Sequence, residues 1–340
     1  MRTVIYHHRW LTVSSFFVVF IFSAILSAQA GEVDGKVQKE KVPLISTETE
    51  DYLDTKQEEF SGHLITAATW FDSFFDNERY STEENRTTAR LKLSAGIDRH
   101  ESFEFKPRVR LRLHLPGASD KLNLLISAND DEDFDVERGL SGRNFRDDDA
   151  DVTVGLQYFL AQTKTMNIST TAGVSFNYVY GGLRYRGQYD YGSWQGRLVS
   201  RLLYYTDDGF EFRNQYDVER QISNALLFRT TLDVNWEESE SGLPHGVIFS
   251  LYQVLKYDRA LHYEIGNYFE TSPDYHLSDM VFQLRYRQRF YRDWLVAEVS
   301  PLVSFPKEYD REINPGIIFK LEVEFGHKSY TNQFGRIFSF

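Results

Sequence analysis

Cysteine is absent from all 340 residues of the chain. Its absence excludes a disulfide framework, a thiolate metal site and a lipid-modified cysteine behind a leader. No run of about eighteen apolar residues follows residue 27, so we expect no membrane-spanning helix beyond it. The motifs GxSxG and HExxH and a glycine-rich phosphate loop are missing as well. We therefore expect no metal, no cofactor and no nucleic-acid partner.

The amino end has the three parts of a secretory signal. Arg2 and Arg9 lie near the start without any acid, an apolar run covers residues 11–27, and Ala28-Gln29-Ala30 offers a small-residue cleavage site. An uncleaved anchor helix is the alternative. Residues 1–30 are therefore predicted to be a signal peptide, and the mature chain is predicted to be exported.

Residues 31–85 are predicted to be a polar amino-terminal segment in the periplasm. Within it, apolar side chains recur at helical spacing over residues 62–78. They are Leu64, Ala67, Ala68, Phe71, Phe74 and Phe75. This spacing predicts a short amphipathic helix, which either packs against the end of the following domain or plugs it.

From residue 86 the sequence pattern has a period of two. The segment KPRVRLRLHLP, residues 106–116, alternates arginine and histidine with valine and leucine. Successive side chains of a strand point to opposite faces, so one face of this segment is apolar and the other is cationic. Similar alternation recurs up to residue 326, in blocks about as long as a tilted strand needs to cross a bilayer.

A soluble antiparallel sandwich also alternates, but three features favour a transmembrane barrel. The strands are long, Arg and Glu load the polar face, and aromatic residues gather at the strand ends as in membrane-interface girdles. The girdle residues are predicted to be Tyr178, Tyr180, Tyr185, Tyr204 and Trp236 at one rim and Trp194, Phe290, Tyr291 and Trp294 at the other. The predicted fold class is all-β: a transmembrane antiparallel β-barrel over residues 86–326, preceded by the short periplasmic helix.

Fourteen strands are predicted in this region. Their approximate ranges are 87–100, 103–115, 120–129, 151–163, 167–179, 183–191, 195–205, 210–220, 225–236, 246–257, 260–270, 279–291, 294–305 and 315–326. Short turns alternate with longer loops, which predicts short periplasmic turns, longer outer loops and two periplasmic termini. Residues 315–326 are expected to close the barrel and residues 327–340 to form a C-terminal tail, although Gln333–Phe340 also resembles the terminal signal of such barrels.

Strand parity assigns many charged side chains to the barrel lumen. The cations are Arg90, Lys92, Arg108, Arg110, Arg112, Arg184, Arg186, Arg197, Arg201, Arg213, Arg285, Arg287, Arg289 and Lys320. The acids are Asp190, Glu211, Asp217, Glu219, Asp233, Glu264, Glu298, Glu322 and Glu324. Cations outnumber acids on this face although the chain has a net charge of −12. The prediction is an arginine-rich anion path, in which some arginines pair across strands because an unpaired charge in a narrow lumen is costly.

Three runs of the sequence carry a resemblance to a known family. WFDSFFDNERYSTEENRT before RLKL, RYRQRFYRDWLVAEVSPLVSFPKEYDRE and NPGIIFKLEVEFG resemble uncharacterised proteobacterial outer-membrane proteins. The resemblance spans roughly residues 70–326 and implies an outer-membrane barrel, but no activity. Residues 327–340 depart from it.

Three functions fit these patterns. The first is a passive channel or transporter for small polar, in particular anionic, solutes. The second is a non-conducting structural or envelope-assembly barrel whose lumen is filled by salt bridges. The third is an outer-membrane hydrolase that uses His276 with Asp274 and Asp279. For all three, the expected location is the outer membrane and the expected partners are lipid, lipopolysaccharide and the barrel-assembly machinery.

Overall fold

The computed structural model describes Phe74 and residues 87–100, 103–115, 121–128, 152–163, 165–290 and 294–325. The chain divides into two compact units, Met1–Tyr52 and Leu53–Phe340, and the described residues belong to the second. The predicted signal peptide 1–30 and tail 327–340 lie outside the described residues, and so does segment 31–85 apart from Phe74. Phe74 is helical, but the other residues of the predicted helix 62–78 are not described, and the helix stays a prediction.

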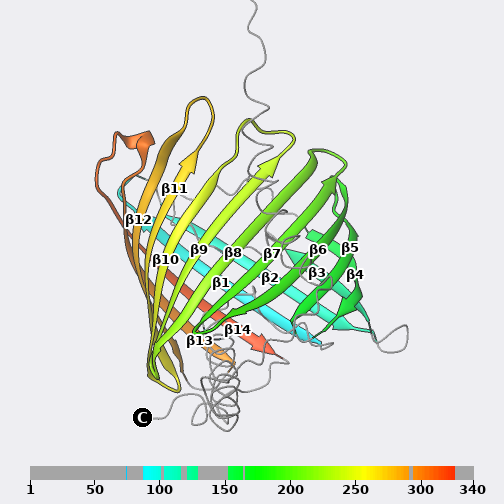
Figure 1. Cartoon of the computed structure of the whole chain (residues 1–340), viewed down its shortest axis with the longest axis horizontal. Coiled ribbons are helices and arrows are strands. Elements are labelled where there is room, and N and C mark those ends of the chain that lie inside the picture. Colours follow the sequence, from blue (N-terminus) through cyan, green and yellow to red (C-terminus); the bar gives the residue numbers. More distant parts are fainter. Residues whose placement is uncertain are drawn as a thin grey trace, which may run out of the picture. The chain divides into compact units, whose positions relative to one another are not determined.

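Fourteen antiparallel strands form a closed barrel (Figure 1). They are β1 (Thr88–Asp98), β2 (Glu104–His114), β3 (Leu122–Ala128), β4 (Val152–Gln162), β5 (Met166–Val174), β6 (Val179–Tyr191), β7 (Trp194–Tyr205), β8 (Gly209–Ser223), β9 (Leu226–Glu237), β10 (His245–Lys256), β11 (Arg259–Glu270), β12 (His276–Arg289), β13 (Leu295–Ser304) and β14 (Asn314–Phe325). Each strand pairs with its neighbours in sequence, and β14 pairs with β1 to close the ring. Closure leaves no edge strand in the sheet, which is the condition for a sheet to cross a bilayer. The predicted strand number and the closing role of residues 315–326 are confirmed.

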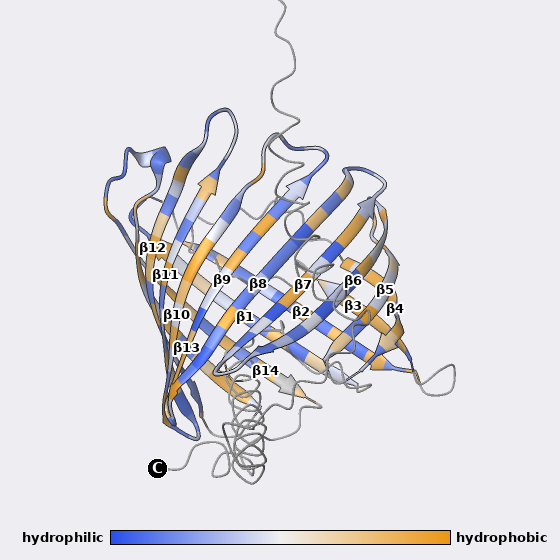
Figure 2. Ribbon diagram, in the orientation of Figure 1, coloured by the Kyte–Doolittle hydropathy of each residue, from blue (hydrophilic) through white to orange (hydrophobic). Residues whose placement is uncertain are grey.

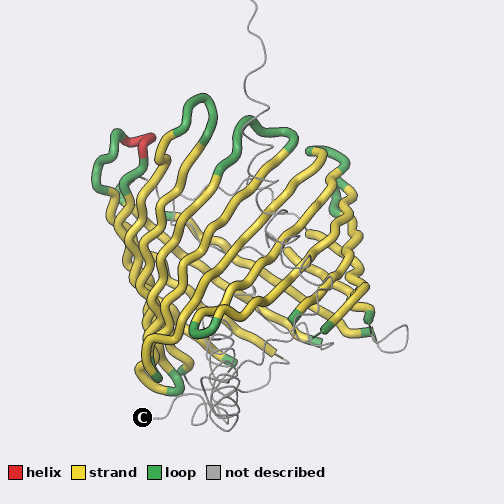
Figure 3. Tube along the Cα trace, in the orientation of Figure 1, coloured by secondary structure: helices red, strands yellow, loops and turns green. Residues whose placement is uncertain are grey.

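The shortest connections and the longest ones lie at opposite ends of the barrel. Residues 192–193, 224–225 and 257–258 make tight turns, whereas residues 238–244 and 305–313 make longer loops. The second of these loops contains a short 3-10 helix, η2 (Lys307–Tyr309). The longer loops gather at one end of the barrel, the upper end in Figure 3. This asymmetry is typical of outer-membrane barrels.

The boundary between β5 and β6 differs from the prediction. The sequence predicted strands 167–179 and 183–191, but β5 ends at Val174 and β6 begins at Val179. In the turn between them, the Ser175 amide donates to the Tyr178 carbonyl at 2.8 Å. Alternation of large and small side chains runs on through Phe176, so the pattern gives no sign that the chain reverses there.

Hydrophilic and hydrophobic residues alternate along the strands (Figure 2), and the exposure of their side chains shows that the two faces of the barrel differ as predicted. On β4, Leu156 and Leu160 are exposed on the outer face, whereas Gln157 and Phe159 are buried on the inner face. On β2, Val109 is 46% exposed on the outside, between lumen-facing arginines. Apolar side chains predominate on the outer face of the described strands, as lipid contact requires, so the transmembrane barrel is confirmed. Among the described residues, no helix is long and apolar enough to cross a bilayer.

Aromatic side chains lie at both ends of the outer face. Tyr204 packs against Phe210 at the end with the longer loops, and Trp294 stacks on Phe325 at the end with the short turns. Another predicted girdle residue, Tyr291, lies outside the described residues.

Tyr180 was wrongly assigned to the outer girdle. The early turn makes it the second residue of β6, where it faces the lumen and is 4% exposed. Its ring covers Gly155 and Gly173: a Cβ at Gly173 would lie 2.6 Å from the ring atoms of Tyr180. Glycine on the neighbouring strands therefore makes room for an inward-pointing tyrosine.

Candidate functional site in the barrel lumen

The structure places the predicted charged residues on the inner face of their strands. The buried cations are Lys92, Arg184, Arg197, Arg201, Arg285, Arg287 and Lys320. The partly exposed cations are Arg90, Arg108, Arg110, Arg112, Arg186, Arg213 and Arg289. The buried acids are Glu211, Asp217, Glu219, Asp233, Glu264, Glu298 and Glu322, and Asp190 is exposed. Of Glu324 the structure describes the backbone, which lies opposite Arg90 in the β1–β14 ladder.

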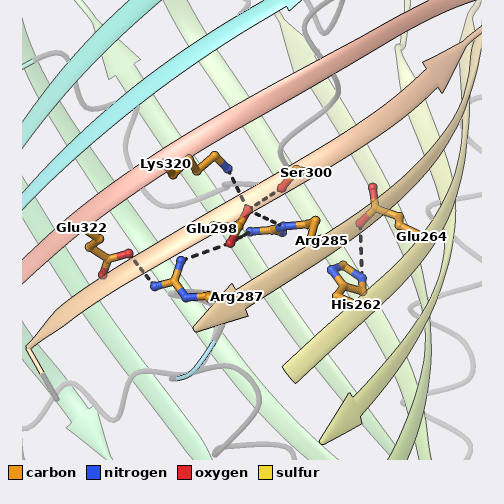
Figure 4. A network of polar contacts seen from close by, with 8 residues as sticks. All are labelled: His262, Glu264, Arg285, Arg287, Glu298, Ser300, Lys320 and Glu322. Carbon is orange, nitrogen blue, oxygen red and sulfur yellow. Dashed lines mark hydrogen bonds and ion pairs between the residues drawn. The ribbon is translucent and has the colours of Figure 1, made fainter. Parts of the chain in front are cut away.

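Glu298 on β13 is the centre of one ion-pair cluster (Figure 4). Its carboxylate accepts hydrogen bonds from Arg285 at 2.9 and 3.2 Å and from Arg287 at 3.2 Å. The Ser300 hydroxyl donates to it at 2.9 Å, and Lys320 Nζ lies 3.5 Å from it. Charge-assisted hydrogen bonds of this kind are roughly twice as strong as neutral ones.

The cluster continues from β13 to β1. Arg287 also donates to Glu322 on β14 at 2.5 Å, and the second oxygen of Glu322 lies 3.4 Å from Arg90 Nε. On its other side, Arg285 lies opposite His262 in the β11–β12 ladder. His262 Nε2 lies 3.5 Å from Glu264.

Glu219 on β8 is the centre of a second cluster. Its carboxylate accepts hydrogen bonds from Arg197 at 2.7 Å and from Arg229 at 2.9 Å. The Arg229 guanidinium lies 5.1 Å above the Tyr252 ring, and that ring stacks on His262 with the centroids 4.2 Å apart. The second cluster thus meets the first at His262.

We call this chain of contacts the ion-pair belt. It consists of Arg90, Arg197, Glu219, Arg229, Tyr252, His262, Glu264, Arg285, Arg287, Glu298, Ser300, Lys320 and Glu322. Its members come from β7 through β14 and from β1. Nearly all are buried, and each carboxylate at a cluster centre contacts at least two cations. The belt therefore holds its charges in fixed mutual pairs.

Arg229 is a belt residue that the sequence reasoning missed. It is fully buried, at 0% exposure, and it joins Glu219 to Tyr252. Arg229 has the same parity on β9 as Asp233, which was assigned to the lumen. Strand parity would therefore have assigned Arg229 to the lumen as well. The lumen also holds a small apolar cluster of Ile248, Tyr268 and Val281. The residues predicted for the lumen were all charged and did not include this cluster.

A different lining covers the strands from β2 to β7, and we call it the arginine wall. It consists of Arg108, Arg110, Arg112, Arg184, Arg186 and Arg201. On the described parts of β2 to β6, the inward-facing acids are Glu104 and Asp190. They lie near the strand ends, where Glu104 pairs with Lys106 at 2.7 Å and Asp190 accepts from Gln195 at 3.0 Å. The middle of this wall is therefore strongly cationic.

Like charges lie directly opposite each other across the wall. Arg184 is the ladder partner of Arg201, and Arg90 is the partner of Arg110. Lys92 is likewise the partner of Arg108. Opposed like charges destabilise a sheet unless another group compensates them, and Arg90 of one pair contacts Glu322 of the ion-pair belt at 3.4 Å. The strands between them offer small neutral side chains, such as Thr171 on β5.

Two further predicted cations lie outside both groups. Arg213 pairs with Glu211 on the same strand, toward the longer loops. The Arg289 guanidinium, at the short-turn end of β12, lies 4.8 Å from the ring centroid of Phe74. Phe74 is 1% exposed, so its side chain packs against the barrel near Arg289.

The histidine proposed for a hydrolase makes other contacts. His276 Nδ1 lies 2.7 Å from the backbone carbonyl of Asp274, and Nε2 lies 3.7 Å from Glu270. The Asp279 carboxylate accepts hydrogen bonds from the backbone amides of Met280 and Phe305. These contacts hold the β11–β12 connection, residues 271–275, and the start of β12 in place. Across the described residues, no group of three or more His, Asp or Glu is placed to hold a metal ion.

No family model and no curated protein matches the chain. Solved outer-membrane structures do match it. A loop-deletion mutant of OmpT, an outer membrane protein of Vibrio cholerae, is 9% identical over 70% of this chain and 98% of that chain, with a TM-score of 0.44. Pseudomonas putida OprB is 8% identical over 71% and 94%, with a TM-score of 0.44. The anion-selective porin from Comamonas acidovorans is 8% identical over 70% and 98%, with a TM-score of 0.41. Likeness at this level establishes neither a family nor a solute for this chain.

Proposed function

We propose that the protein is a passive channel that carries small anionic solutes across the outer membrane, along the arginine wall. The proposal rests on one observation: the buried acids and their arginine partners lie in the ion-pair belt, whereas the arginine wall lies on the other strands. The acids Glu219, Glu298 and Glu322 lie in the belt, where arginines already neutralise them. On the described parts of β2 to β6, the middle of the arginine wall carries arginines and neutral side chains.

A cationic wall in a low-dielectric barrel raises the local concentration of anions. Field lines are focused when one sign of charge lines a narrow passage with apolar surroundings, and the encounter rate of an oppositely charged solute rises with them. The belt has the complementary role of holding the rest of the lumen together. In this proposal the short turns and both termini face the periplasm, lipid and lipopolysaccharide surround the outer face, and the barrel-assembly machinery inserts the chain.

A non-conducting structural barrel is the second candidate. The observation in its favour is the belt itself, because buried ion pairs spread over β7 through β14 and β1 rigidify a barrel and need no solute. The two candidates differ in what they require of the arginine wall. A channel needs the wall to be wet and reachable from both sides, whereas a structural barrel needs only its contribution to packing.

Reversal potentials test the proposal. In a potassium chloride gradient across a planar bilayer, the protein is expected to conduct and to favour chloride over potassium. Arg110→Gln combined with Arg112→Gln is expected to reduce this preference several-fold, because two cations leave the wall. The matched control is Arg220→Gln, since Arg220 is exposed on the outer face, 5.5 Å above the Trp194 ring, and the substitution is chemically the same.

The control should leave both conductance and selectivity unchanged. A folded protein with no conductance would favour the structural barrel, and equal selectivity in the double variant and the wild type would remove the arginine wall from the path.

A further inference from the structure

A polar pair lies on the outer face of the barrel, on two neighbouring strands. Ser200 of β7 and Asn214 of β8 are direct ladder partners, and the Ser200 hydroxyl donates to the side-chain oxygen of Asn214. Both side chains point outward, because they share the parity of Leu202 and Phe212, which are exposed on the same two strands. A polar pair therefore interrupts the apolar surface that faces lipid.

The depth of this pair makes it costly against lipid. Ser200 lies midway along β7, between Trp194 at one aromatic rim and Tyr204 at the other. The Asn214 amide nitrogen carries two donor hydrogens, and in the part of the chain that the structure describes they have no acceptor. Hydrocarbon supplies none either, and a polar group without a partner is costly there.

Other amide side chains on the outer face lie at different depths. Gln253, Asn267 and Gln288 are within three residues of the end of their strands, where water at the membrane surface reaches them. Asn267 also donates to the Val247 carbonyl at 3.4 Å. Polar side chains at the depth of Asn214 mark contacts with other protein more often than contacts with lipid.

Four tyrosines extend the polar surface toward the short-turn end. Tyr185 is the ladder partner of Ser200, and its hydroxyl lies 2.6 Å from that of Tyr189. The hydroxyls of Tyr191 and Tyr216 form a second hydrogen-bonded pair. In each pair one hydroxyl donates, so the other keeps a hydrogen to give. We call Tyr185, Tyr189, Tyr191, Ser200, Asn214 and Tyr216 the outer polar patch; it covers β6, β7 and β8, which lie side by side (Figure 1).

The outer polar patch is flat and complements itself. A Cβ at Gly196 of β7 would lie 2.8 Å from both the Tyr191 ring and the Tyr216 hydroxyl, so these side chains lie down on the sheet. A flat surface lets another flat surface approach closely. Asparagine, serine and tyrosine side chains each donate and accept, so across a two-fold axis the Asn214 amide of each copy can donate to the Asn214 or Ser200 oxygen of the other.

We infer that the outer polar patch is a dimer interface within the membrane and that its occupant is a second copy of this chain. The second copy supplies the acceptors that lipid lacks, and a two-fold contact between identical surfaces is the commonest arrangement of homo-oligomers. This inference goes beyond the proposed function, because it holds whether or not the lumen conducts.

Sedimentation equilibrium of the refolded full chain in neutral detergent micelles tests the interface. We expect a monomer–dimer equilibrium whose dissociation constant rises at least tenfold in Asn214→Leu and several-fold in Ser200→Ala. Both substitutions make the outer face more apolar, so the variant monomers are expected to fold. The matched control is Asn267→Leu, the same chemical change on β11, and it should dissociate as the wild type does.

Crosslinking in lipid vesicles locates the contact and decides the result if detergent competes for the patch. Leu198→Cys places a thiol on the outer face of β7 beside Tyr216, and Leu284→Cys places one on the outer face of β12. With a short bis-maleimide reagent, we expect crosslinked dimers from the first variant and few from the second. Equal crosslinking at the two positions, or a dimer that Asn214→Leu and Asn267→Leu weaken equally, would overturn the interface. So would a chain that stays monomeric in both measurements.

Discussion

Glu298→Leu is expected to lower the free energy of unfolding by about 3–5 kcal/mol, the cost of leaving buried charges without their partner. Glu298 is 2% exposed, and its carboxylate contacts Arg285, Arg287 and Lys320. Leucine fills a similar volume but leaves these cations facing one another in a poorly hydrated lumen. Urea unfolding of the protein refolded into lipid vesicles, followed by tryptophan fluorescence, measures the change.

Two comparisons show whether charge burial causes this loss. Glu104→Leu removes a carboxylate from a partly exposed pair with Lys106, and such pairs contribute about 0–1 kcal/mol. Arg285→Met combined with Glu298→Leu removes one cation together with the acid and should recover part of the stability. A loss below about 1 kcal/mol in Glu298→Leu would mean that water solvates the belt.

Leu321→Arg is expected to lower the free energy of unfolding by about 2–4 kcal/mol in lipid vesicles. Leu321 lies on the outer face of β14, where its ladder partners are Leu93 on β1 and Ala297 on β13. All three project away from the lumen, so an arginine at this position enters the hydrocarbon near the middle of the strand.

Phe325→Arg is the matched control for this substitution. Phe325 lies on the same strand and face but at the rim, beside Trp294. Near the interface, the cost of arginine falls to about 0–1 kcal/mol. A dependence on depth is characteristic of a bilayer, because the surface of a soluble sandwich would tolerate both substitutions. Equal costs at the two positions would contradict a membrane-spanning β14.

The barrel could be predicted from the sequence because its determinants are local. Alternation along each strand sets the face of every side chain, and it assigned Arg184 and Glu298 to the lumen without any knowledge of the neighbouring strands. The misplaced β5–β6 turn shows the limit of this reasoning. Alternation continued through Phe176, and a tight turn of polar and aromatic residues left no break in the period.

The ion-pair belt could not be predicted in the same way. Parity gives the face of a residue but neither its depth nor its partner, because these depend on the register of each strand against the next. Glu298 contacts both Arg285 and Lys320 only because β12, β13 and β14 are aligned as they are. The division of the lumen into a paired belt and an arginine wall is therefore a property of the closed sheet.

In the proposed channel, the arginine wall is open to anions, whereas the ion-pair belt excludes water. The natural absence of cysteine allows a direct test, because a single introduced thiol has no background. Thr171→Cys places a thiol on β5, on the inner face of the barrel among the strands of the arginine wall, and Ser300→Cys places one in the belt, where Ser300 is 0% exposed. The measurement is the rate at which a negatively charged methanethiosulfonate reagent modifies each thiol in the folded protein, read by mass spectrometry. We expect fast modification at residue 171, slower with a positively charged reagent, and almost none at residue 300. Slow modification at residue 171, or equal rates at the two positions, would contradict an anion path along the arginine wall.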